Sequence, residues 1–184
     1  MRYPAEETAE RHRRILEVAS VLFREHGFGS VSVGQIMKAS GLTQGAFYHH
    51  FDSKEALINE CLHDASAKSL KKMAEVGEGT ESMVSHILDY VSEWHRDAVG
   101  TGCMIAALGS DAAHEPSIQP VFTRHIEGVL EGLMAANRTL SSDVSRASAI
   151  RTLSGMVGAI ILARAVDDGE LSGEILHEMR RALN

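Results

Sequence analysis

Apolar residues recur at helical spacing over residues 5–26, and this periodicity limits the fold more than any other feature of the sequence. A glycine, Gly27, follows the stripe and is the residue expected just past the end of a helix. The same spacing continues along the chain, and aromatic residues make up only 5% of it, which disfavours an all-β fold. We therefore predict an all-α protein. The first stripe consists of Ile15, Leu16, Val18, Ala19, Leu22 and Phe23.

Capping signals and glycines mark where the later helices are expected to begin and end. Ser32 followed by Gln35 is a capping-box pattern, and Asp52 followed by Glu55 looks like a second cap. Gly169 is expected to end a long helix that is capped by residues 141–143. The predicted helices after the first span about 33 to the break at Gly41, 44–49, 53–76, 81–99, 103–113, 117 or 120 to 137, 143–167 and 172–183.

Residues 31–51 are the segment most informative about function. They predict two short helices joined by a tight turn at Ser40–Leu42, where Gly41 can adopt the positive φ that a sharp reversal needs. Such a helix-turn-helix places the start of its second helix in the major groove of DNA. Spacing alone would also fit a generic helical hairpin with a glycine turn.

The second helix of this pair begins with residues suited to DNA. Thr43 offers a hydroxyl to a phosphate, and Gln44 offers an amide to an adenine edge. Gly45 lets the backbone approach closely, and Lys54 can contact a phosphate at the start of the next helix. The predicted DNA-binding residues are Ser32, Val33, Thr43, Gln44, Gly45, Tyr48, His49 and Lys54.

The charge distribution allows a local DNA-binding face. The net charge of −7 divides into −1 for the first sixty residues and −6 for the remainder. The acidic remainder is expected to stay away from the phosphates.

The segment from about Ile15 to Leu57 resembles the DNA-binding domain of the TetR (tetracycline-repressor-like) family. The run G-x-x-x-G-x-x-Y-x-x-F-x-x-K-E-x-L, from Gly41 to Leu57, is highly specific to that family. The resemblance implies an all-helical, dimeric protein that a ligand in the larger domain releases from its operator. Matching positions are Ile15, Ala19, Phe23, Gly27, Phe28, Val33, Ile36, Ala39, Gly41, Gly45, Tyr48, Phe51, Lys54, Glu55 and Leu57.

The sequence favours neither an enzyme nor a cofactor or metal protein. No two histidines are three or four residues apart, and no nucleophile-elbow or phosphate-loop motif occurs. Cys61 and Cys103 form neither a disulfide framework nor a zinc site. The N-terminus is polar, and the most apolar stretch, residues 152–163, is short for a membrane span. A cytoplasmic protein without membrane contact is expected.

Helical stripes in the middle of the chain are mostly core, but polar groups on the same helices suggest an effector pocket. The predicted effector is small and apolar or amphipathic. A strongly anionic ligand is disfavoured unless Arg96 or Arg124 faces inward. The predicted lining consists of Tyr90, Trp94, Met104, Phe122 and His125.

The last two helices are predicted to form a two-fold homodimer. The helix over 143–167 carries more apolar surface than one protomer's core needs, and its small residues permit close approach of a partner. The predicted interface consists of Ile150, Ser154, Val157, Gly158, Ile161 and Ile175.

These features predict an N-terminal three-helix helix-turn-helix domain at 1–52 and a C-terminal helical effector and dimerisation domain at 53–184. The predicted function is a ligand-responsive transcriptional repressor that binds double-stranded, palindromic operator DNA. Two alternatives stay open. One is a helical protein-interaction module that does not bind DNA, and the other is a thiol-based electrophile or redox sensor that uses Cys103 on the same scaffold.

Overall fold

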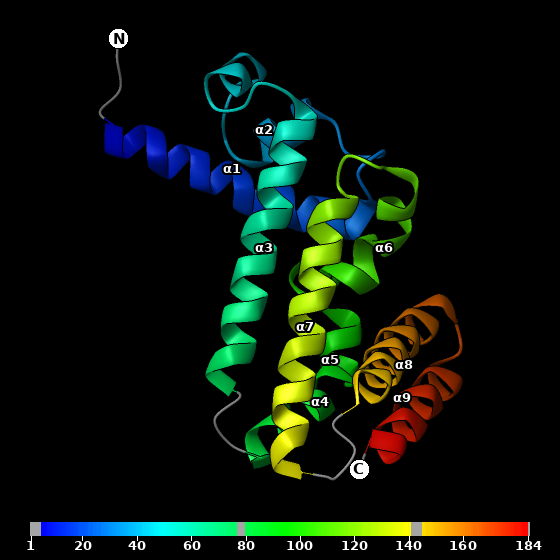
Figure 1. The fold of residues 1–184 in the computed structure, drawn as a ribbon. Helices are drawn as coiled ribbons and strands as arrows, with labels where there is room; N and C mark the ends of the chain where they lie inside the picture. The colour runs from blue at the N-terminus through cyan, green and yellow to red at the C-terminus, as the bar shows by residue number, and fades with distance from the viewer. Residues whose placement is uncertain (1–4, 77–79, 141–144, 184) are drawn as a thin grey trace.

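The chain folds into helices packed along and across one another (Figure 1). The computed structural model describes residues 5–76, 80–140 and 145–183, and within these ranges every regular element is a helix, as predicted. The elements are α1 (Ala5–His26), α2 (Val33–Ala39), the 3₁₀ helix η1 (Gln44–His49), α3 (Lys54–Val76), α4 (Thr80–Tyr90), α5 (Glu93–Asp97), η2 (Val99–Thr101), α6 (Met104–His114), α7 (Gln119–Leu140), α8 (Arg146–Ala165) and α9 (Gly169–Leu183).

The first helices end and begin where the sequence predicts. Gly27 ends α1 with a φ of 77°, and Gly41 turns the chain between α2 and η1 with a φ of 71°. The capping box at α2 is confirmed: Ser32 Oγ accepts the Gln35 N–H at 3.3 Å, and Gln35 Oε1 accepts the Ser32 N–H at 2.8 Å. Local residue chemistry therefore fixes the start of α2 through its capping box and the turn into η1 through Gly41.

Two predicted caps are wrong, and a third lies outside the described residues. Ser53, not Asp52, caps α3, because its hydroxyl accepts the Ala56 N–H at 3.1 Å. Gly169 begins α9 instead of ending α8, since the Asp168 carboxylate accepts the N–H groups of residues 170 and 171. Ser145 caps α8, and the predicted caps at 141–143 lie outside the described residues.

The single helix predicted over 81–99 is also wrong, because the chain breaks at Val91–Ser92 into α4 and α5. Ser92 caps α5 by accepting the His95 N–H at 3.2 Å, and it donates to the Asp89 carbonyl at 2.6 Å. The His95 ring bonds the Tyr90 carbonyl at 2.6 Å. These side-chain bonds occupy backbone groups that a continuous helix would pair within itself.

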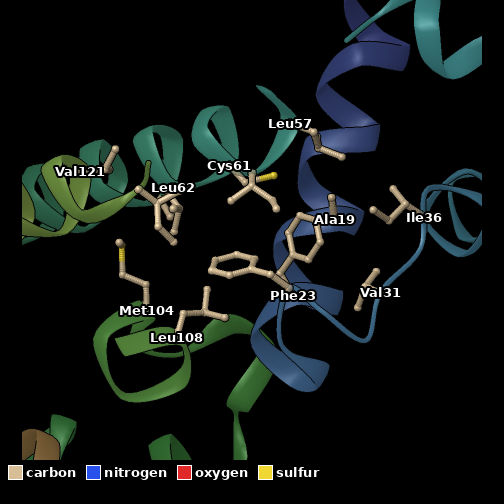
Figure 2. Close-up of a cluster of buried hydrophobic side chains, with 14 of the residues drawn as sticks. Ala19, Phe23, Val31, Ile36, Leu57, Cys61, Leu62, Met104, Leu108 and Val121 are labelled. Atoms are coloured by element: carbon tan, nitrogen blue, oxygen red, sulfur yellow. The ribbon is translucent and has the colours of Figure 1, made fainter. Parts of the chain in front are cut away.

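One apolar cluster joins the N-terminal helices to the rest of the chain. Figure 2 shows Phe23 of α1 among side chains from α3 and α6, including Leu62 and Leu108. The cluster therefore crosses the predicted domain boundary at 52/53, which stays a prediction. Its labelled members are Ala19, Phe23, Val31, Ile36, Leu57, Cys61, Leu62, Met104, Leu108 and Val121.

Polar contacts fasten the C-terminal end of α1 to three later elements. The Asp111 carboxylate of α6 accepts the Phe28 N–H at 3.4 Å, and the Lys54 ammonium of α3 donates to the Phe28 carbonyl at 2.5 Å. Arg24 donates to the carbonyl of Gly100, in η2, at 3.2 Å. Helix α1 is thus held to α3, η2 and α6 together.

We expect Gly100→Ala to lower the free energy of unfolding by about 1–3 kcal/mol, as overpacking does. A Cβ at Gly100 would lie 2.7 Å from Val21 Cγ1 and 2.7 Å from Glu25 Oε1 of α1. Urea unfolding followed by circular dichroism measures the change. Gly29→Ala is the matched control, because a Cβ at Gly29 meets no atom within 4 Å. Equal stability of the two variants would show that α1 does not pack tightly on η2.

Candidate functional site

The predicted DNA-binding residues of η1 form an exposed surface at one end of the molecule, beside α2 (Figure 1). The Tyr48 side chain is 70% exposed although its neighbour Phe47 is fully buried. The two rings meet edge to face at 5.2 Å, so the buried Phe47 supports the projecting Tyr48. The other exposed members of the surface are Thr43, Gln44, Gly45 and His49.

Two glycines shape this surface in different ways. A Cβ at Gly34 would lie 3.3 Å from Gln44 Oε1, so the absence of a side chain on α2 leaves room for the Gln44 amide. A Cβ at Gly45 would meet nothing within 4 Å, and Gly45 has no positive φ. Neither packing nor backbone strain requires glycine at position 45, and its bare backbone faces outward.

The remaining predicted DNA-binding residues also have structural roles. The Ser32 hydroxyl belongs to the capping box, and Val33 packs against the apolar cluster. Lys54 is half-buried and holds the Phe28 carbonyl. Thr43 occupies the N-cap position of η1 without a side-chain capping bond. Removal of Lys54 therefore affects the α1–α2 loop as well as any phosphate contact.

A cavity of about 1090 Å³ lies in the helical body. Its walls come from α1, α3, α4, α5, the 100–103 segment, α6, α7 and α8. One part is apolar, formed by Met73, Ile87, Val129, Leu133, Leu153 and Met156. The part beside α1 is polar, with Ser20, Arg24, Asp64 and Thr101.

Three of the five predicted pocket residues line this cavity, and two do not. Tyr90, Trp94 and His125 are on its wall, and Trp94 is 75% exposed. Met104 and Phe122 are buried in the cluster that joins α1 to α3 and α6. Those two predictions are wrong because the faces that carry Met104 and Phe122 are turned toward the DNA-proximal core.

Arg24 is a functional candidate that the sequence did not indicate. It lines the cavity from α1, and its Nε is one of two buried side-chain polar atoms without a hydrogen-bond partner among the described residues; the other is the Tyr90 hydroxyl. Both orphaned groups thus belong to side chains of the cavity wall. Unsatisfied buried donors are uncommon in folded proteins, so these two groups mark the wall as a place where an acceptor could bind.

The protonation state of His95 is fixed by its bonds. Because a carbonyl only accepts, Nδ1 must carry the proton that bonds the Tyr90 carbonyl. Nε2 must then be unprotonated, since it accepts the Cys103 N–H at 3.0 Å. Burial also lowers the pKa of His95, which favours the same neutral form. The neutral imidazole therefore ties α5 to the segment before α6.

Two further cavity histidines are also disfavoured as cations. His125 is 2% exposed, with Nδ1 3.0 Å from the Ser66 hydroxyl, and burial lowers its pKa. Burial, followed by the charge of Lys72, lowers the pKa of His86. The lining thus combines neutral imidazoles with the cationic side chains of Arg24, Lys68 and Lys72.

The two cysteines lie in different environments. Cys61 is buried, its thiol donates to the Leu16 carbonyl at 3.6 Å, and burial raises its pKa to about 12. Cys103 is half-buried on the cavity wall, so the thiol-sensor alternative stays a prediction for that residue alone. Among the described residues, no group of three or more His, Cys, Asp or Glu is placed to hold a metal ion.

Four of the predicted dimer residues recur every three or four positions along α8: Ile150, Ser154, Gly158 and Ile161. Ile150 and Ile161 are each 45% exposed, and a Cβ at Gly158 meets no atom within 4 Å. Val157 is half-buried. Ile175 instead packs against the chain's own cluster around Val91 and Ile160, because α9 turns that face toward α8.

Helix α8 is strongly apolar although most of it is not buried within one chain. It is long and apolar enough to cross a membrane by length and composition, and only 28% of that stretch is buried within one chain. Its outer face continues onto Leu162 of α8 and Leu171 of α9, which are both exposed. Four large apolar side chains are therefore exposed on the α8–α9 pair: Ile150, Ile161, Leu162 and Leu171.

Comparison with known proteins agrees with this geometry. Residues 15–61 match the family described as "Bacterial regulatory proteins, tetR family". The chain is 26% identical to the HTH-type transcriptional regulator UidR of Escherichia coli K12, over 84% of this chain and 82% of that protein. It is 40% identical to the HTH-type transcriptional repressor KstR2 of Rhodococcus jostii, over 32% of this chain and 30% of that protein.

Solved structures show the same fold. Reduced E. coli NemR superposes with a TM-score of 0.81 at 18% identity, over 95% of each chain. A TetR-family regulator from Agrobacterium tumefaciens gives a TM-score of 0.80 at 22% identity, over 95% of this chain and 98% of that one.

The fold and its exposed recognition surface define a helix-turn-helix DNA-binding regulator. Residues 15–61 match the DNA-binding domain of the TetR family of transcriptional regulators, and the whole chain has the fold of the solved TetR-family structures. The resemblance drawn from residues 15–57 is thereby confirmed, and the alternative of an interaction module that does not bind DNA is set aside.

We expect the protein to lose stability as the pH falls from about 7.5 to 5.5. Unfolded imidazoles take up protons near pH 6.5, whereas the pKa values of His86, His95 and His125 are lowered in the folded chain. The unfolded state then binds more protons below about pH 6.5, so stability present above that pH is lost on acidification. Urea midpoints at the two pH values measure this loss.

The His95→Gln variant should show a smaller pH-dependent change in its urea midpoint. His63→Gln is the control, because its side chain is exposed on α3. A pH-independent midpoint in the unmodified protein would contradict the neutral, buried assignment of these histidines.

Proposed function

We propose that this regulator is a repressor that binds a pseudo-palindromic operator as a homodimer and is released by a small molecule in the cavity. It acts on DNA in the cytoplasm and carries out no catalysis. The observation that carries the proposal is the exposed surface of η1, where Gln44, Gly45 and Tyr48 project beyond a buried support. The match of residues 15–61 to the family supports the same role.

DNA contact explains the composition of this surface. The outward backbone at Gly45 suits close approach to a groove wall, and the Gln44 amide suits an adenine edge. Tyr48 and His49 lie further along η1, where they can contact the sugar-phosphate backbone. Two recognition elements about 34–36 Å apart would fit successive major grooves.

Dimerisation explains the exposed face of α8. A two-fold pair of α8–α9 hairpins would cover Ile150, Ile161 and Leu162 with the same residues of a second chain. Gly158 lies on that face without a neighbour of its own, which leaves room for a partner helix. Repressor action is supported by the similarity to KstR2, which is a transcriptional repressor.

A small-molecule effector explains the cavity. Its volume of about 1090 Å³ exceeds what a small molecule needs, and its lining combines an apolar region with a few polar groups. Because α1 and α3 both contribute to the wall, an occupant touches helices that position η1.

We expect Gly45→Leu to weaken operator binding at least about ten-fold, because the added side chain projects where DNA must approach. Gln44→Ala should cost about 1–3 kcal/mol on the preferred site and little on unrelated duplex. Operator duplexes selected from a random pool, with fluorescence anisotropy as readout, measure both effects. Gly29→Ala should bind normally. Unchanged affinity in both η1 variants would exclude this surface as the DNA contact.

We expect Gly158→Leu to convert the dimer to monomers. The leucine should not disturb the protomer, since no atom lies within 4 Å of a Cβ at Gly158 and leucine favours a helix over glycine. Sedimentation velocity at micromolar concentration gives the oligomeric state, and circular dichroism gives the helix content. Gly45→Leu is the reciprocal control and should remain dimeric. A dimeric Gly158→Leu protein would place the interface elsewhere.

A further inference from the structure

Arg24 is a cation on the cavity wall without a carboxylate partner. Among the described residues no acidic side chain lies within ion-pair distance of it. The nearest cavity carboxylate, Asp64, pairs with Lys68 at 2.7 Å. The other acidic side chains of the lining, Glu17 and Asp89, are exposed. Arg24 is half-buried, and a cation withdrawn from water is costly unless it is paired. A negatively charged partner would therefore stabilise Arg24.

The hydrogen bonds of Arg24 leave one edge of its guanidinium unused. Nη1 makes every protein bond recorded for this side chain: to the Ser20 carbonyl at 3.1 Å, the Ser20 hydroxyl at 3.0 Å and the Gly100 carbonyl at 3.2 Å. Nε is buried without a partner. Nε and Nη2 together form the edge that binds a carboxylate through two parallel bonds.

The second orphaned donor lies near the same segment of chain. Arg24 bonds Gly100, and the Tyr90 hydroxyl neighbours the side chain of Cys103, three residues further on. The thiol of Cys103 is only a weak hydrogen-bond acceptor. Arg24 and Tyr90 therefore both contact the 100–103 segment, and an oxygen acceptor would satisfy the Arg24 Nε, and would bind the Tyr90 hydroxyl more strongly than the Cys103 thiol does.

We propose that the effector is an amphipathic carboxylate, or a similar compact oxyanion, whose charged end pairs with Arg24 and whose apolar body lies along α3 toward Met73. This inference rests on the proposed effector cavity and names its ligand class. The helical rise makes the distance from Asp64 to Met73 about 13–14 Å, which accommodates a medium-length apolar chain. The assignment of Arg24 to the charged end replaces the expectation that an anionic effector requires Arg96 or Arg124. Arg96 binds Asp97 and Ser172, and Arg124 is exposed.

Recognition by Arg24 also links the ligand directly to the DNA-proximal helix. Nε is buried, so a carboxylate reaches it only if α1 and residues 99–103 separate or if Arg24 turns into the cavity. Either movement breaks the bond from Arg24 to the Gly100 carbonyl. An anionic effector thereby loosens the contact that holds α1 against η2.

A pair of probes with one chain length tests the charge preference. Decanoate and 1-decanol are used to displace the fluorescent neutral probe N-phenyl-1-naphthylamine from the full-length protein at about pH 7.5, where decanoate is ionised. The unmodified protein should bind decanoate at least about ten-fold more tightly than 1-decanol. Arg24→Met should abolish this preference while its affinity for 1-decanol changes by less than about two-fold.

Two further variants separate charge recognition from folding. Arg24→Lys keeps a cation and should retain part of the preference for decanoate. Lys71→Met removes an exposed cation of α3 that does not line the cavity and should retain all of it. Equal affinity for the two probes in the unmodified protein overturns the ligand class. Equal loss of affinity for both probes in Arg24→Met would also overturn it. The same holds if Arg24→Lys shows no more preference for decanoate than Arg24→Met does. Failure of N-phenyl-1-naphthylamine to bind at all would overturn the effector cavity itself.

Discussion

The packing of α1 determines how the rest of the structure is arranged. One side of this helix contributes Ile15, Ala19 and Phe23 to the cluster that supports α2 and η1. Another side contributes Glu17, Ser20, Val21 and Arg24 to the cavity wall. Residues three or four apart lie on one helix face, so a single helix serves both regions without an intervening element. The candidate DNA-binding surface and the cavity are therefore both in contact with α1.

The part of the fold that local chemistry determines was predictable from the sequence. The bounds of α1, the capping box at Ser32 and the positive φ of Gly27 and Gly41 follow from residue types within a few positions. The break between α4 and α5 did not, because it depends on the Ser92 and His95 side chains replacing backbone bonds in a segment whose apolar spacing stays helical. Caps were misplaced where several capping residues stand together, as at Asp52–Ser53.

The candidate sites were predictable to different extents for a related reason. The exposure of the η1 residues could be anticipated because a short motif fixes their direction, and their contact with DNA stays a prediction. Assignment of cavity residues required knowing which face of each helix meets which neighbour. Met104 and Phe122 share their helices with residues of the wall but point into the core. Arg24 was missed because it follows Phe23 in a helix whose apolar stripe drew attention to packing, and only tertiary structure shows its unpaired Nε at the cavity.

The arrangement of α1 shortens the route from effector to DNA. Helix α3 follows the η1 recognition segment directly in the chain, so a swing of α3 would be one way for an effector to move η1. In the structure α3 and α1 both line the cavity, and α1 is also held by Asp111, Lys54 and Gly100. An effector that weakens one of these attachments need favour the released geometry by only a few kcal/mol to shift the population. If the charged end of the effector binds Arg24, the binding energy acts directly on α1, the helix that shares an apolar cluster with η1. Movement of α3 would then follow release instead of causing it.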